Sequence, residues 1–173
     1  MGDVPSDWQV VRIKRTADLR SDRCAEASDG AQYIGLEDVE SGTGQYRPTV
    51  GSARQNENST VGVFKTGDVL YGKLRPYLKK AIVSDADGVC STEFLVLQPK
   101  TVISPWLHQW LLTTGVTQQI EAGCEGAKMP RADCGARQGS CRLIHAASGL
   151  VSQKNQNNRW SMQQSRQLNL TQR

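Results

Sequence analysis

Five residues with charged or aromatic side chains fall within eight positions of the chain. They are Lys73, Arg75, Tyr77, Lys79 and Lys80, in the segment YGKLRPYLKK. Lysine and arginine bind phosphate groups, and an aromatic ring among them is typical of nucleic-acid-binding surfaces. The segment can therefore hold a phosphate backbone while a neighbouring loop reads bases. The alternative is a solvated strand edge on which lysines oppose aggregation, and the residues alone do not decide between the two.

The tyrosines of this segment have a simpler interpretation. Tyr71 and Tyr77 could stack on bases, but paired duplex DNA offers few free base faces. We therefore expect both rings to be half-buried against the protein.

A second small basic site follows a glycine-rich turn. In GCEGAKMPRAD, Lys128 and Arg131 flank Met129-Pro130, with Gly123 and Gly126 before them. The alternative for this segment is an ordinary surface loop.

Catalytic chemistry has little support in the sequence. None of the common nucleotide-binding, serine-hydrolase or zinc-protease motifs occurs. Cys90, in GVCSTEF, has no nearby histidine or helix N-terminus to lower its pKa, so we expect a buried structural thiol. The five cysteines include no C-x-x-C pair and there are two histidines, so we expect no metal and no cofactor.

The net charge of +4 belongs to the end of the chain. Residues 1–133 carry 15 Lys or Arg and 17 Asp or Glu, whereas residues 134–173 carry six basic and no acidic residues. The overall charge is therefore no argument for nucleic-acid binding by the folded part. The sequence contains no apolar run long enough to span a membrane and no apolar leader at its start, so we expect a soluble, cytoplasmic protein with reduced thiols.

Short apolar runs separated by turn residues predict a single β-rich α/β (α+β) domain with a few short helices. Between these runs, Ala17–Ala31 is expected to be irregular and Glu40–Thr60 to be a long polar loop. Trp8–Ile13 is expected to be a strand or a turn. The expected strands after it are Tyr33–Val39, Val61–Phe64, Asp68–Tyr71, Lys79–Ser84 and Glu93–Leu97.

A helix is predicted after the last strand. Ser104 is the expected N-cap, with Pro105 at the first helical position. Gly115 is expected to break the helix, and Val116–Ala122 to form a shorter one. The apolar face of the first helix is expected to contain Trp106, Leu107, Trp110 and Leu111.

Four motifs occur in a fixed order: YIGLEDVESGTG, GDVLYGKLRPYLKKA, DGVCSTEFLVLQPK and GAKMPRAD. Together with the opening VPSDW, they resemble the target recognition domain of the DNA specificity subunit of type I restriction–modification enzymes. The resemblance covers residues 4–133.

The resemblance implies a β-rich recognition domain that grips the major groove of one half of a split DNA site and has no catalysis of its own. Methylation and cleavage belong to separate methyltransferase and restriction subunits. It implies that Lys73, Arg75, Tyr77 and Lys79 form a sheet-edge or phosphate-facing set. Lys80, from the same cluster, joins the predicted DNA-binding residues. The resemblance also implies a contact by Lys128 and Arg131, in a turn that Gly123 and Gly126 allow to bend.

Residues 134–173 depart from the family. Eleven of these 40 residues are Gln or Asn, and the segment is expected to be a disordered, low-complexity tail. The proline-rich motif and long helix of the family are absent. We hypothesise that a frameshift near codon 134 truncated a longer gene and left a fragment with reduced or no activity.

Two other functions remain open from the sequence. The domain could be a protein-interaction module of a multisubunit complex without DNA contact, or a small enzyme that uses Cys90.

Overall fold

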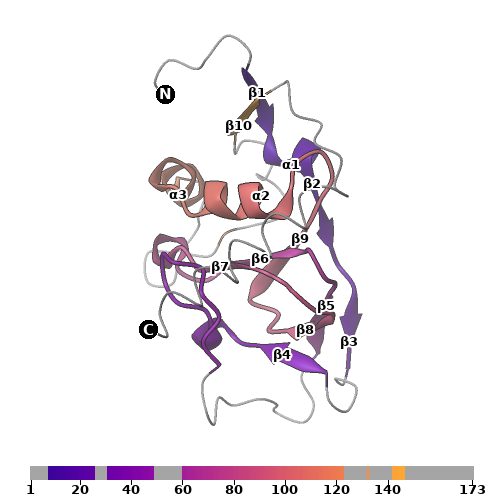
Figure 1. Cartoon of the computed structure of the whole chain (residues 1–173). Helices are drawn as coiled ribbons and strands as arrows, with labels where there is room; N and C mark the ends of the chain where they lie inside the picture. Colours follow the sequence, from indigo (N-terminus) through magenta and orange to yellow (C-terminus); the bar gives the residue numbers. More distant parts are fainter. Residues whose placement is uncertain (1–7, 26–30, 49–59, 123–131, 133–141, 147–173) are drawn as a thin grey trace, which may run out of the picture. The chain divides into compact units, whose positions relative to one another are not determined.

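The computed structural model describes residues 8–25, 31–48, 60–122, 132 and 142–146. The chain divides into two compact units, residues 10–143 and residues 1–9 with 144–173. The first unit contains both four-stranded sheets and every described helix (Figure 1).

The central sheet has the strand order β2-β9-β6-β7 and is antiparallel throughout. Its register places Leu70 opposite both Val96 and Ile82, so three branched side chains line up across the sheet. The strands are β2 (Ala17–Arg20), β9 (Phe94–Pro99), β6 (Val69–Gly72) and β7 (Ala81–Val83).

The second sheet has the order β3-β5-β8-β4, with β4 parallel to β8 and the other pairs antiparallel. A 3-10 turn, η1 (Leu36–Asp38), follows β4. The strands are β3 (Arg23–Cys24), β5 (Val61–Phe64), β8 (Gly88–Cys90) and β4 (Gln32–Ile34).

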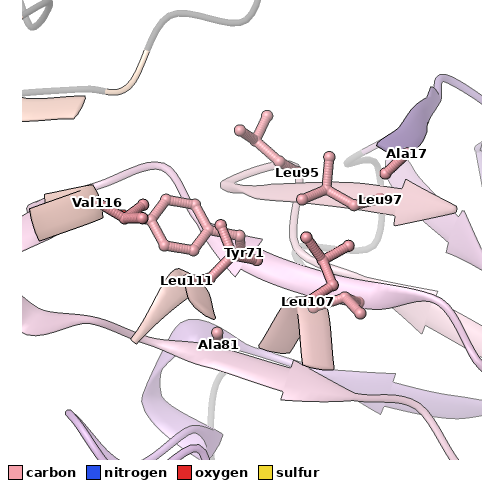
Figure 2. Close-up of a cluster of buried hydrophobic side chains, with 9 residues drawn as sticks. Ala17, Tyr71, Ala81, Leu95, Leu97, Leu107, Leu111 and Val116 are labelled. Atoms are coloured by element: carbon pink, nitrogen blue, oxygen red, sulfur yellow. The ribbon is translucent and has the colours of Figure 1, made fainter. Parts of the chain in front are cut away.

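The central sheet is buried on both faces because successive side chains of a strand point to opposite sides. Val69 and Tyr71 of β6 face the helices, whereas Leu70 between them faces the second sheet. Figure 2 shows the helix-side cluster, in which Tyr71 lies among side chains of α2 and α3. The uninterrupted apolar runs of β6 and β9 therefore reflect a middle layer with a core on each side.

Three α-helices are described: α1 (Ile13–Thr16), α2 (Ser104–Leu111) and α3 (Thr114–Glu121). Leu107 and Leu111 are fully buried. Trp106 and Trp110 stack with 5.6 Å between ring centroids and pack against the helix-side cluster. The predicted apolar face of this helix is therefore confirmed.

Two details of the helix prediction are wrong. Ile103 is the N-cap of α2, and Ser104 is the first helical residue, whose hydroxyl donates to the Gly67 carbonyl at 2.6 Å. Gly115 does not break a helix but lies in the first turn of α3, which begins after Thr113. A tertiary hydrogen bond thus uses the hydroxyl that the sequence suggested as a cap.

The strand predictions are confirmed for β5, β6, β7 and β9, and the α+β class is confirmed with them. The prediction that Ala17–Ala31 is irregular is wrong, because β2 and β3 both lie within it. The short strand β8 was not predicted. Trp8–Arg12 forms β1, close to its predicted range, and pairs with β10 (Arg142–Ala146) in a two-stranded sheet.

The strand β10 lies in the segment predicted to be a disordered tail. The polar composition lies mainly in the residues after Val151, whereas the apolar pair Leu143-Ile144 of β10 lies before them. The domain boundary at residue 133 and the frameshift hypothesis stay predictions.

Candidate nucleic-acid interface

The predicted basic residues Lys73–Lys80 form the connection between β6 and β7, and we call this segment the basic turn. It contains one 3-10 turn, η2 (Pro76–Leu78). The backbone on both sides of η2 is left-handed, with φ of 53° at Arg75 and 49° at Lys79. Such a conformation costs a residue with a side chain about 1 kcal/mol, and it persists only where the surroundings enforce it.

Backbone hydrogen bonds hold the base of the basic turn. Gly72 N donates to Lys80 O at 2.8 Å, which closes the two strands, and Lys73 N donates to Glu93 O at 2.8 Å. Within the turn, Lys79 N donates to Pro76 O at 2.9 Å. The strained residues are therefore fixed by the sheet below them.

Two of the five predicted side chains bind the protein itself. Lys80 Nζ donates to the Leu36 carbonyl at 2.6 Å, and Lys79 Nζ donates to Thr114 Oγ1 at 2.9 Å. Lys80 thus joins the basic turn to η1, and Lys79 joins it to α3. Both ammonium groups already have an acceptor, which leaves less of their capacity for an external phosphate.

The other cations of the basic turn are open. Within the described part of the chain, Lys73 and Arg75 make no side-chain hydrogen bond and no ion pair. Arg75 is exposed, and Tyr77 in η2 is 50% exposed. The basic turn therefore presents the exposed Arg75, the half-buried Lys73 and an aromatic ring, and neither cation has an ion pair within the described residues.

The prediction that both tyrosine rings are half-buried is wrong. Tyr77 is more exposed than expected, and Tyr71 is more buried, with 1% exposure in the helix-side core. Because β6 is a central strand, Tyr71 cannot reach an external ligand.

The second predicted basic site, Lys128 with Arg131, lies outside the described residues, as do Gly123 and Gly126. The residue that follows, Ala132, donates its backbone N–H to the Lys73 carbonyl at 2.9 Å. One end of the glycine-rich segment therefore adjoins the basic turn.

Some basic side chains elsewhere in the first unit are paired with carboxylates. Arg20 Nε lies 2.7 Å from Asp68 Oδ2, and Lys65 Nζ lies 2.9 Å from Asp87 Oδ2. Lys100 Nζ lies 2.7 Å from Asp18 Oδ2. These pairs supply controls in which the same charge is removed elsewhere on the protein.

Cys90 is buried, as predicted. Burial raises the pKa of the Cys90 thiol to about 12, although the nearby Lys73 charge acts in the opposite direction. The thiolate that a cysteine nucleophile requires is therefore scarce near neutral pH. The geometry argues against the Cys90 enzyme.

Two further kinds of feature are absent from the described residues. No group of three or more His, Cys, Asp or Glu side chains there could hold a metal ion. None of the helices in that part is long and apolar enough to cross a membrane.

Comparison with known proteins connects this fold to one family. No family model matches the chain. The specificity subunit of the type I restriction enzyme EcoDI from Escherichia coli is 29% identical over 116 residues, which cover 66% of this chain and 26% of that protein. The chain therefore spans about a quarter of the length of the curated relative.

Solved structures of type I systems have a similar fold. One, from a study of complex assembly and conformational transition of the type I restriction–modification system, superposes with a TM-score of 0.66 at 18% identity, covering 99% of this chain and 46% of its own. The HsdS subunit from Thermoanaerobacter tengcongensis superposes with a TM-score of 0.64 at 20% identity. The match covers 83% of this chain and 39% of that subunit.

The S subunit from M. genitalium gives a TM-score of 0.53 at 11% identity, covering 86% of this chain and 37% of its own. The structural likenesses establish the fold, and the sequence match is to the specificity subunit of one of these enzymes. The predicted resemblance is confirmed: in sequence over 116 residues and in fold, this chain resembles a target recognition domain of type I specificity subunits.

Proposed function

We propose that this chain binds double-stranded DNA at one half of a bipartite site, as the specificity module of a type I restriction–modification complex. One observation carries the proposal: the basic turn presents Lys73 and Arg75 without a carboxylate partner in the described part, on a fold shared with specificity subunits. Unpaired cations on a rigid backbone are suited to phosphate oxygens.

The five predicted residues divide into two groups under this proposal. Lys73 and Arg75 contact phosphates, and Tyr77 lies beside them on the exposed side of η2. Lys79 and Lys80 hold the basic turn against Thr114 and Leu36. Lys128 and Arg131, which lie outside the described residues, are further phosphate contacts in the proposal.

The chain contributes recognition rather than catalysis in this proposal. A methyltransferase subunit and a restriction subunit supply the chemistry, and the other half of the DNA site is bound by a second recognition domain. Titration of purified methyltransferase subunit with the full chain, by sedimentation or calorimetry, tests this assembly independently of DNA binding.

The DNA proposal is tested by the salt dependence of binding. We expect the full chain to bind a fluorescein-labelled random duplex pool with an affinity that falls between roughly 50 and 200 mM salt. Lys73→Ala with Arg75→Ala should reduce the slope of log K against log salt by about 1.8, since each phosphate contact contributes about 0.9.

The matched control is Lys65→Ala with Lys100→Ala, which removes two charges from outside the basic turn. Its slope should stay near that of the unmodified chain. Equal slopes for the two double variants would show that the basic turn is not the contact surface. Binding to a methyltransferase subunit without binding to any duplex would instead support a protein-interaction module.

A further inference from the structure

A second exposed element lies beside the basic turn, the hairpin of residues 40–47. Val39 and Tyr46 form an isolated antiparallel bridge at its base. Glu40 N donates to Gln45 O at 2.9 Å, and Arg47 N donates to Asp38 O at 2.7 Å. The tip bends through Gly42 and Gly44, whose φ angles of 77° and 70° favour glycine. The segment predicted as an irregular polar loop thus begins with a defined hairpin.

Contacts fasten the hairpin to the basic turn. Gly42 N donates to Lys79 O at 3.3 Å, and the Lys80 ammonium binds the Leu36 carbonyl just before the hairpin. Gly44 packs so closely on His108 and the Ala81 carbonyl that a Cβ atom there would overlap both. The hairpin and the basic turn are therefore neighbours on one surface, and a ligand held by one can contact the other.

The hairpin has a different chemical character from the basic turn. Glu40 balances Arg47, with 3.4 Å between Oε2 and Nη2, so the hairpin attracts phosphate weakly. It nevertheless exposes hydroxyl, amide and guanidinium groups, the side-chain types that hydrogen-bond to base edges in the major groove. The residues are Thr43, Gln45 and Arg47, and the Arg47 side chain is 66% exposed.

We infer that the hairpin of residues 40–47 reads base edges in the major groove while the basic turn grips the adjacent phosphates. Gln45 and Arg47 are the specificity-determining residues in this inference, which rests on the proposed DNA-binding function. Arg47 Nη2 donates a hydrogen bond to Gln45 Oε1 at 3.2 Å and forms an ion pair with Glu40 Oε2. These two contacts hold the Arg47 guanidinium in place before DNA binds. A fixed guanidinium is suited to a bidentate contact with guanine.

The experiment selects bound sequences from a random duplex library with the full chain, over several rounds. The variants are Gln45→Ala and Arg47→Lys, and the second keeps the charge but removes the planar fork. Both side chains are exposed, and thermal unfolding confirms that each variant is folded. We expect preference for at least one base pair of the selected site to fall about ten-fold, with the salt slope unchanged.

The outcomes separate the two proposals. Lys73→Ala with Arg75→Ala should flatten the salt slope yet select the same bases as the unmodified chain. If both hairpin variants select those bases with undiminished preference, or if salt-dependent binding occurs without any base preference, the inference is overturned and the proposed function stands. If the unmodified chain binds no duplex at all, both proposals fail.

Discussion

The basic turn and the corner between β5 and β6 contain similar charged residues but use them in opposite ways. In the corner, Asp68 accepts hydrogen bonds from Arg20 Nε and from the Lys65 backbone N–H, at 2.7 and 2.9 Å. In the basic turn, Lys73 and Arg75 have no such partner within the described residues. The contrast teaches that a cation's surroundings, and not its position in a cluster of sequence, determine whether it stabilises the fold or stays available to a ligand.

The largest expected effect is on the corner. Asp68→Ala should lower the free energy of unfolding by about 3 kcal/mol, because it leaves the partly buried Arg20 guanidinium without its main acceptor. Urea unfolding measures the change. The control is Asp18→Ala, whose exposed partner Lys100 makes the expected loss less than about 1 kcal/mol. Equal losses of unfolding free energy in the two variants would show that burial of the Arg20–Asp68 pair adds no stability.

We expect the free energy of unfolding to depend on pH in mild acid because of His108, which binds the carbonyl of Ala81, the residue after the basic turn. Burial lowers the pKa of His108 below its ordinary value of 6.5, although its hydrogen bond to the Ala81 carbonyl opposes the shift. Below pH 6.5 the unfolded chain gains a proton that the folded chain resists, so the free energy of unfolding should fall as pH drops from 7 toward 5. His108→Gln should remove that fall.

Urea unfolding at a series of pH values measures the change, with the unmodified chain titrated in parallel as the control. If His108→Gln keeps the pH dependence of the unmodified chain between pH 7 and 5, the assignment to His108 is contradicted.

The strain in the basic turn predicts a trade between stability and binding. Arg75→Asn should raise the free energy of unfolding by about 0.5 kcal/mol, because Asn tolerates a left-handed backbone better than Arg does. The same change should reduce the salt slope of DNA binding by about 0.9. A loss of stability with an unchanged slope would show that Arg75 belongs with the structural cations of the corner.

The smallest expected effect concerns the corner in strong acid. Hydrogen bonds from Lys65 Nζ and from Thr66 lower the pKa of Asp87 from 3.8 to about 2. The stabilisation by Asp87 is therefore complete above pH 3.8 and is lost as the pH falls toward 2. Acid unfolding of Asp87→Asn should start at a slightly higher pH than that of the unmodified chain, and coincident curves would exclude the carboxylate as a contributor.

The sequence predicted the parts of the fold that local patterns determine. The runs that became β5, β6 and β9 are apolar along their length, and a turn signal bounds each of them. The polar run of β2 has no such pattern, because its place at the edge of the central sheet comes from pairing with β9, some 80 residues later. Edge strands defined by distant partners are invisible to a local pattern.

The site follows the same rule. The cluster of cations was predictable because its members are adjacent in the chain. The sequence could not show which of these cations bind the protein itself. The partners of Lys79 and Lys80 are Thr114 and Leu36, each about 35 or more residues away in the chain. The hairpin was hidden for the same reason, because its docking depends on Lys79 and His108.

The position of β9 in the middle of the central sheet has a consequence for biosynthesis. β9 pairs with β2 on one side and with β6 on the other, and it supplies side chains to both cores. The ribosome must therefore release residues up to about Pro99 before the sheet can close. Until then β6 can pair only with β7, and β2 has no partner in the central sheet. Contacts this distant in sequence make folding slow and leave nascent chains prone to aggregation. We expect the growing chain to depend on chaperones until β9 emerges.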